Sequence, residues 1–189
     1  MDPLLPLVRT LHERSVRFVL IGVAGANYYA MAGSDSFLTQ DRDLFLPLDS
    51  DNLVASWAAC EAAGLGLWSG QEPLDWPHDR WLADRVIERR VLTRAAAEDM
   101  QVDLTLVMEG FEFETVWNER RTFKVDHVDI PVARLLHIVQ SKHATGCDKD
   151  CLFLATHRDA LEQLFEAGRI LEQSRQRYRY TDATNSRRR

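Results

Sequence analysis

The feature that most constrains the fold is a change of hydrophobic pattern near residue 130 of the chain. Before that point, short apolar runs such as RFVLIG (17–22) alternate with segments of helical periodicity. After it, only helical patterns follow, over 132–145 and from 149 to 172, with a break at Gly146. Mixed strands and helices followed by helices alone predict an α+β domain, with a mixed β-sheet flanked by helices and a helical C-terminal region.

The pattern of apolar residues and of turn residues predicts the individual elements. Helices are expected at 4–14, 23–32, 50–63 and 111–118. Strands are expected at 17–22, 42–47, 85–93 and 101–107, and a hairpin at 122–130. The segment 65–81 is dense in tryptophan, proline and glycine, and it is expected to form a structured loop or lid.

The predicted organisation has three parts: an α+β core over 1–130, a helical region over 131–172 that completes the site, and an arginine-rich tail over 173–189. The tail carries no hydrophobic period. It is interpreted either as a solvated, flexible terminus or as an electrostatic arm for RNA.

Charge and composition exclude several classes of protein. A net charge of −6 argues against a chain that binds nucleic acid through its overall charge. No apolar stretch is long enough to span a membrane, and the first residues lack the pattern of a signal peptide. Three cysteines, Cys60, Cys147 and Cys151, show no disulfide framework, which predicts a reducing cytoplasm as the location.

Three aspartates carry the clearest chemical signal. Asp41 and Asp43 stand at the start of a predicted strand, and residues two apart on a strand project to the same face. Asp103 lies inside another predicted strand among apolar neighbours, where a carboxylate is costly unless something compensates its charge. If the two strands are adjacent, the carboxylates converge, and such a cluster is typical of Mg²⁺ sites that also bind substrate phosphates.

Plainer interpretations remain for these residues and for others. The aspartate pair can be solvated surface charge, and Asp103 can be a core carboxylate paired with an arginine such as Arg89 or Arg90. His143, Cys147 and Cys151 have helical spacing that could hold zinc, but buried cysteines acting as small hydrophobes are favoured. Tryptophans either pack in the core and lid or stack on a base, the candidates for stacking being Trp68, Trp76 and Trp81.

The order of four segments resembles the DNA polymerase β-like nucleotidyltransferase superfamily. The segments are FVLIGVAGANYYA (18–30), LTQDRDLFL (38–46), MQVDLTLV (100–107) and IPVARLLHIVQSKHATGCDKD (130–150). The chain is most similar to AbiEii-type toxins and related bacterial nucleotidyltransferase-like proteins over residues 17 to 155. The resemblance implies a nucleotidyltransferase fold over the core.

The same resemblance implies roles for particular residues. Asp41, Asp43 and Asp103 would be catalytic and would ligate Mg²⁺ or Mn²⁺. The nucleotide would be bound by Gly22 at the turn, by Thr39 at the start of the T-x-D-x-D motif, by Lys142 and by Asp150. The activity implied is transfer of a nucleoside monophosphate from a nucleoside triphosphate (NTP) to a hydroxyl group, releasing pyrophosphate.

The acceptor implied by the toxin resemblance is RNA, especially a tRNA 3′ end. A protein side chain or a small molecule such as an aminoglycoside or lincosamide is an alternative, and a toxin would have a cognate antitoxin as partner. Two positions depart from the family pattern: Val23 replaces a small residue, and Phe37 stands where relatives often carry arginine. They favour the rival interpretation of a catalytically impaired module that binds a nucleotide or a partner.

Overall fold

The computed structural model describes residues 3–30, 37, 39, 41–98 and 100–166. The chain falls into two units, Met1–Gly146 and Cys147–Arg189. The predicted division into 1–130, 131–172 and 173–189 stays a prediction, and the arginine-rich tail lies outside the described residues.

The first unit alternates helices and strands. Its helices are α1 (Leu4–Glu13), α2 (Gly22–Ala30), α3 (Ser50–Ala62), α4 (Arg80–Glu88), α5 (Phe113–Glu119) and α6 (Leu135–Thr145). Its strands are β1 (Val19–Ile21), β2 (Asp41–Phe45), β3 (Gly66–Ser69), β4 (Glu72–Pro73), β5 (Thr93–Ala97), β6 (Met100–Thr105), β7 (Arg121–Val125) and β8 (Val128–Val132). The second unit contains α7 (Asp148–Thr156), followed by helical residues at 158–166.

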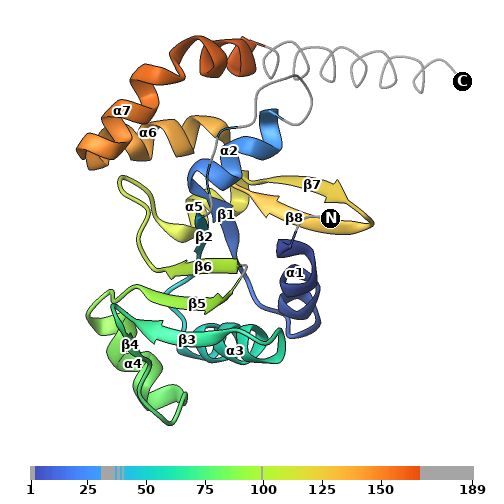
Figure 1. The fold of residues 1–189 in the computed structure, drawn as a ribbon, viewed down its shortest axis with the longest axis vertical. Coiled ribbons are helices and arrows are strands. Elements are labelled where there is room, and N and C mark those ends of the chain that lie inside the picture. Colours follow the sequence, from blue (N-terminus) through green and yellow to red (C-terminus); the bar gives the residue numbers. More distant parts are fainter. Residues whose placement is uncertain (1–2, 31–36, 38, 40, 99, 167–189) are drawn as a thin grey trace, which may run out of the picture. The chain divides into compact units, whose positions relative to one another are not determined.

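All of these strands join one sheet in the order β4-β3-β5-β6-β2-β1-β8-β7 (Figure 1). The pairs β2–β6 and β1–β8 are parallel, and the other pairs are antiparallel. The expected mixed sheet flanked by helices is therefore confirmed. No helix among the described residues combines the length and apolar character needed to cross a membrane.

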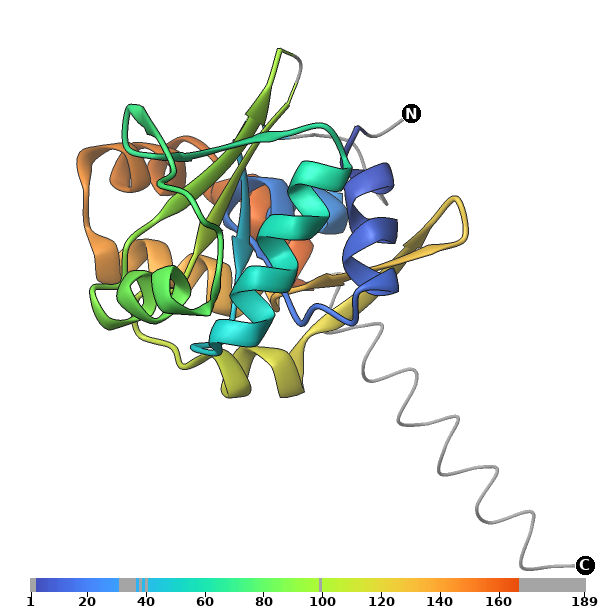
Figure 2. The ribbon, with the colours of Figure 1, turned by 90° about the horizontal axis from the view of Figure 1, so that it is seen from below.

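One face of the sheet carries the main hydrophobic core. Side chains from β1, β2, β5 and β6 pack there against the apolar sides of α1 and α3, which lie in front of the strands in Figure 2. The strand residues in this core include Leu20, Leu44, Ala95, Val102 and Leu104, all completely buried. Strand alternation explains the pattern, because every second residue of these strands is apolar.

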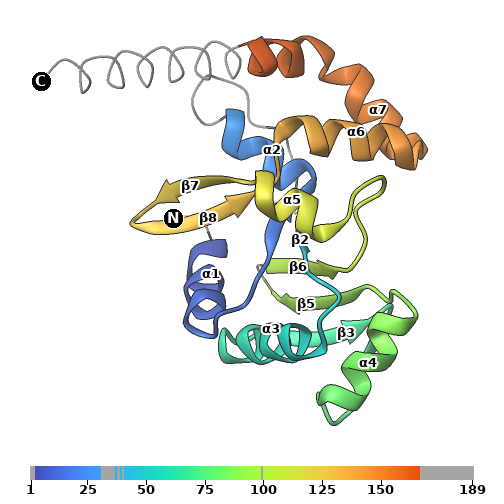
Figure 3. The same ribbon diagram turned by 180° about the vertical axis from the view of Figure 1, so that it is seen from behind.

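The opposite face is apolar only near β1 and the C-terminal end of β2. Val19, Ile21 and Phe45 pack there in a second cluster with residues of α5 and α6. Toward β3, at the end of the sheet far from β7 and β8 (Figure 3), the same face instead carries polar and partly exposed side chains. The predicted carboxylates lie in this polar part.

Two predicted segments need correction. A strand was expected at 85–93, but α4 occupies Arg80–Glu88 and β5 begins only at Thr93. Asp79 caps α4 by accepting a hydrogen bond from the Leu82 amide, and the buried residues Ala83 and Val86 lie on one side of this helix. The expected lid at 65–81 contains the β3–β4 hairpin, in which Gly70 adopts a positive φ of 62° at the turn.

Candidate functional site

The three predicted carboxylates lie on one face of neighbouring strands. Asp41 and Asp43 belong to β2, and in the parallel β2–β6 pair Asp43 is the Cα partner of Asp103. Partners in adjacent strands project to the same side, so the three side chains share the polar face of the sheet. This juxtaposition is what the spacing of Asp41 and Asp43 and the apolar context of Asp103 led us to expect.

Asp103 is held by an arginine that the sequence did not single out. Arg94 is its partner across the antiparallel β5–β6 pair. The guanidinium donates from Nε to Oδ1 at 2.6 Å and from an Nη to Oδ2 at 3.0 Å, a two-pronged, charge-assisted contact. The hydrogen bond to Asp103, with added attraction from Asp103, Asp41 and Asp43, raises the pKa of the Arg94 guanidinium.

The structure pairs Asp103 with an arginine, as the alternative interpretation expected. The arginine is Arg94, however, and the expected partners were wrong. Arg89 and Arg90 follow α4 and lie on the surface. Arg94 was missed because the strand was expected at 85–93. Pairing 93–97 with 100–105 as an antiparallel hairpin would have placed Arg94 opposite Asp103.

Gly22 lies directly against the carboxylate of Asp43. It is the first residue of α2 and adopts a φ of +65°, which favours glycine. A Cβ added at this position would lie 2.2 Å from Oδ2 of Asp43, so any larger residue would collide with the carboxylate. The turn between β1 and α2 thus needs glycine for two independent reasons, and it brings the start of a helix next to Asp43.

Two polar side chains hold the start of β2. The Oγ1 of Thr39 accepts a hydrogen bond from the Asp41 amide at 3.2 Å. Gln101 donates from its amide nitrogen to Oδ1 of Asp41 at 3.2 Å. Thr39 therefore contacts the backbone of the acidic strand, and its predicted contact with nucleotide stays a prediction.

Two of the three aspartates are better placed than the third to hold a divalent cation. Asp41 and Asp43 carry hard carboxylate oxygens on the same face, and the bare Cα of Gly22 lets the Asp43 carboxylate lie directly against the turn. Both oxygens of Asp103 already accept hydrogen bonds from Arg94. Within the part of the chain that the structure describes, no group of three or more His, Cys, Asp or Glu side chains is arranged to hold a metal ion.

The other predicted residues lie on the C-terminal helices. Lys142 is partly buried on α6, one turn beyond Ile138, whose Cδ1 would lie 3.1 Å from a Cβ added at Gly25 of α2. Lys142 is therefore on the helix that packs against α2, and its role stays a prediction. Asp150 belongs to the second unit, where its carboxylate accepts a hydrogen bond from the Cys147 thiol at 3.3 Å. Its predicted role is likewise untested.

The cysteines depart from expectation in one respect. Cys60 is buried, and burial, with a smaller contribution from Glu61, raises the pKa of its thiol to about 12. Cys147 and Cys151 are exposed, so the expectation that they are buried small hydrophobes was wrong. Gly146 ends α6 in the left-handed conformation, which separates Cys147 and Cys151 from the helix that carries His143.

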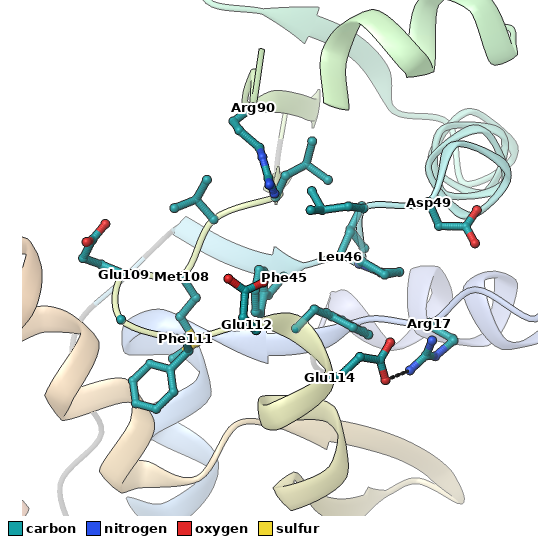
Figure 4. A pocket seen from close by; sticks show the side chains of 16 residues that line it. Arg17, Phe45, Leu46, Asp49, Arg90, Met108, Glu109, Phe111, Glu112 and Glu114 are labelled. Carbon is teal, nitrogen blue, oxygen red and sulfur yellow. Dashed lines mark hydrogen bonds and ion pairs between the residues drawn. The ribbon is translucent and has the colours of Figure 1, made fainter. Parts of the chain in front are cut away.

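A cavity of about 590 Å³ lies elsewhere, at the C-terminal ends of the parallel strands β2 and β6 (Figure 4). Its floor includes Phe45 and Met108, and Arg90 and Glu112 reach toward it from different elements. Arg17 and Glu114 form an ion pair at its edge, at 2.7 Å. None of the three predicted carboxylates lines this cavity.

Comparison with known proteins adds little to this geometry. No family model matches the sequence, and no curated protein matches it. One solved structure that matches is that of the antibiotic-resistance factor ANT(2'')-Ia, with 15% identity and a TM-score of 0.49 over 94% of this chain and 95% of that chain. These values are too low for function to be inferred from the likeness.

Proposed function

We propose that the chain transfers a nucleoside monophosphate from an NTP to a hydroxyl acceptor, with Asp41 and Asp43 as the residues that hold a divalent cation. The observation that carries this proposal is the meeting of Asp41, Asp43 and Asp103 on one face of adjacent strands, beside the glycine turn that begins α2. Carboxylates brought together in this way repel each other, and a bound cation relieves the repulsion.

In this proposal some residues supply or bind charge, and others position the nucleotide. Asp41 and Asp43 would hold Mg²⁺ or Mn²⁺, which when bound supplies positive charge to the triphosphate. The glycine turn lets the α2 N-terminus lie near Asp43, and the partial positive charge of a helix start favours phosphate. Catalysis would rest on positioning and charge neutralisation rather than on a covalent intermediate.

A second candidate function is favoured by the Arg94–Asp103 contact. With both oxygens of Asp103 engaged by Arg94, Asp41 and Asp43 would hold a cation without Asp103 as a third ligand. A protein with this site would bind an NTP without transferring it, as a nucleotide-dependent partner of another macromolecule. The RNA, protein or small-molecule acceptor and the toxin role belong to the first candidate and depend on transfer, whereas membership of a toxin–antitoxin pair is compatible with either candidate.

One pair of measurements separates the two candidates. Thermal melting with Mg²⁺ or Mn²⁺ and each NTP measures binding, because a ligand that binds only the folded state raises the melting temperature. Incubation with labelled NTP and total RNA, then with aminoglycosides and lincosamides, measures transfer. Stabilisation with transfer supports the enzyme, stabilisation without transfer supports the binding module, and no stabilisation by any nucleotide contradicts both.

The carboxylates are tested by the double substitution Asp41→Ala plus Asp43→Ala. We expect transfer to fall by about 100-fold or more, with the melting temperature unchanged or raised, because a repulsive pair is removed. Glu109→Ala plus Glu112→Ala is the matched control, since it removes two exposed acidic charges away from the site. Full activity in the first variant would remove Asp41 and Asp43 from the site.

A further inference from the structure

The polar face of the sheet extends beyond the carboxylates to the β3 edge. Successive cross-strand partners run from Asp43 on β2 through Asp103 on β6 and Arg94 on β5 to Trp68 on β3. Because Cα partners project to the same side, these four side chains form one row across four strands. Adjacent strands are about 4.8 Å apart, so Trp68 lies about 10 Å from the Asp103 position and about 14 Å from the Asp43 position.

The other face of the same strands is closed. Leu67, next to Trp68, is buried in the main core with Ala95, Val102 and Leu104. Trp68 by contrast is 36% exposed. Gly66 lies on the same side of β3, and a Cβ added there would lie 3.4 Å from Nε1 of Trp68, so the missing side chain leaves the indole room to lie along the sheet.

The row presents an aromatic face, then a guanidinium, then carboxylates that can hold a cation. A planar base, a sugar–phosphate and a metal-bound phosphate occur in the same order along a nucleotide. Exposed aromatic side chains stack on bases, and every base has a π-face that such a side chain can contact.

We propose that Trp68 is the residue on which a nucleobase stacks when a nucleotide occupies the carboxylate site. This inference rests on the proposed function for the position of the phosphates. The stacked base belongs either to the NTP or to the terminal nucleotide of an RNA acceptor, and the chemistry of recognition is the same for both. Base stacking tolerates different bases, so Trp68 strengthens binding without selecting strongly among the four nucleotides.

The test compares Trp68→Ala, Trp68→Phe and Trp76→Ala by isothermal titration calorimetry of the full chain. Trp76 is the matched control because it is also exposed, at 80%, but belongs to the other face of the sheet. Its ring stacks on His78, and His78 forms a hydrogen bond with Glu61 of α3. The ligands are ATP, GTP, CTP and UTP with Mg²⁺, a short single-stranded oligoribonucleotide, and inorganic tripolyphosphate, which has no base.

We expect Trp68→Ala to raise the dissociation constant for one class of base-containing ligand about tenfold, with little change for tripolyphosphate. Trp68→Phe keeps an aromatic face and should retain most of the affinity. Trp76→Ala should match the unsubstituted protein. An effect on NTPs assigns the stacked base to the donor, and an effect on the oligoribonucleotide assigns it to the acceptor.

The inference and the proposed function fail in different ways. Equal affinity of Trp68→Ala and Trp76→Ala for every ligand overturns the stacking role even if transfer is observed. An equal loss for tripolyphosphate in Trp68→Ala also overturns it, because the effect would then be structural. Trp68-dependent binding of a base without any transfer supports stacking and contradicts the enzyme. Absence of any binding by the unsubstituted protein overturns both.

Discussion

The two faces of β2, β5 and β6 are built from alternating residues of the same strands, yet they are chemically opposite. One face is a continuous apolar surface sealed by α1 and α3, in which Leu44, Val102 and Leu104 are completely buried. The other carries the partly buried Asp43, the buried Asp103 and their polar neighbours. The closed face holds the fold together, whereas the charges on the polar face are held by specific partners.

The contrast shows how a charge can lie in the middle of a sheet. Asp103 is 9% exposed and is flanked along its strand by buried apolar residues. The free-energy cost of burying this carboxylate is offset by Arg94 on the next strand, which supplies two hydrogen bonds and a positive charge. Substitutions on the two faces should therefore separate stability from binding.

The largest effect on stability is expected on the closed face. Leu104→Ala should lower the free energy of unfolding by about 3 kcal/mol, because it removes a fully buried side chain and leaves a cavity. Urea unfolding measures this loss. Nucleotide affinity of the fraction that remains folded should not change, and a tenfold loss of affinity would show that the two faces are coupled.

The turn beside Asp43 should affect both stability and binding. Gly22→Ala is expected to cost about 2 kcal/mol, since a positive φ is unfavourable for alanine and the new Cβ meets the carboxylate. Gly64→Ala is the control, because Gly64 also has a positive φ of 82° but nothing lies within 4 Å of its Cβ position. Both variants should lose stability, and only Gly22→Ala should lose nucleotide binding. Equal binding in the two would separate the turn from the site.

The ion pair on the polar face should contribute less to the free energy of unfolding than a core side chain does. Arg94→Leu leaves Asp103 without its cation and should cost about 1–2 kcal/mol, because the pair is only partly buried. Adding Asp103→Leu should recover most of that loss, and a double-mutant cycle by urea unfolding measures the coupling. Additive losses would mean that the contact contributes nothing. Mg²⁺ affinity that rises in Arg94→Leu would show that the guanidinium competes with the cation.

The smallest effect on stability is expected for His137, a buried polar side chain in the apolar part of the face opposite α1 and α3. His137 on α6 is buried, its Nδ1 has no hydrogen-bond partner among the described residues, and its ring contacts Phe111. Burial lowers the pKa of His137, opposed by attraction to Glu119 and assisted by repulsion from Arg134. The unfolded chain therefore binds the proton more readily, so stability is full above about pH 6.5 and falls as the pH drops below it.

His137→Leu should remove this part of the pH dependence. Denaturant unfolding at several pH values between 5 and 8 measures the slope in each protein, and the difference between the slopes isolates His137 from the other histidines. An unchanged slope would show that protonation of His137 is not coupled to folding.

Some elements of the fold were predictable from local pattern. The glycine at residue 22 marks the end of a strand and the start of a helix, and the structure places both there. The hairpin at 122–130 was predictable too, and Asp126 and His127 at its turn both have positive φ, as a tight two-residue turn requires. The segment 85–93 was misread because RVIERRVL has enough β-branched residues for a strand, while its helical start is set by Asp79 and Arg80 upstream.

By itself, the sequence determined which residues carry charge into the sheet: Asp41 and Asp43 two apart on one strand, and Asp103 among apolar neighbours on another. Only the tertiary structure decided what lies next to them, because strand order and register are set by packing over the whole sheet rather than by local pattern. Register brought Arg94 onto Asp103, Gly22 against Asp43 and Trp68 into the same row. Arg94 and Asp103 pair within one hairpin, whereas Gly22 and Trp68 are distant along the chain from the aspartates and meet them through the long-range pairing of strands, which no local spacing encodes.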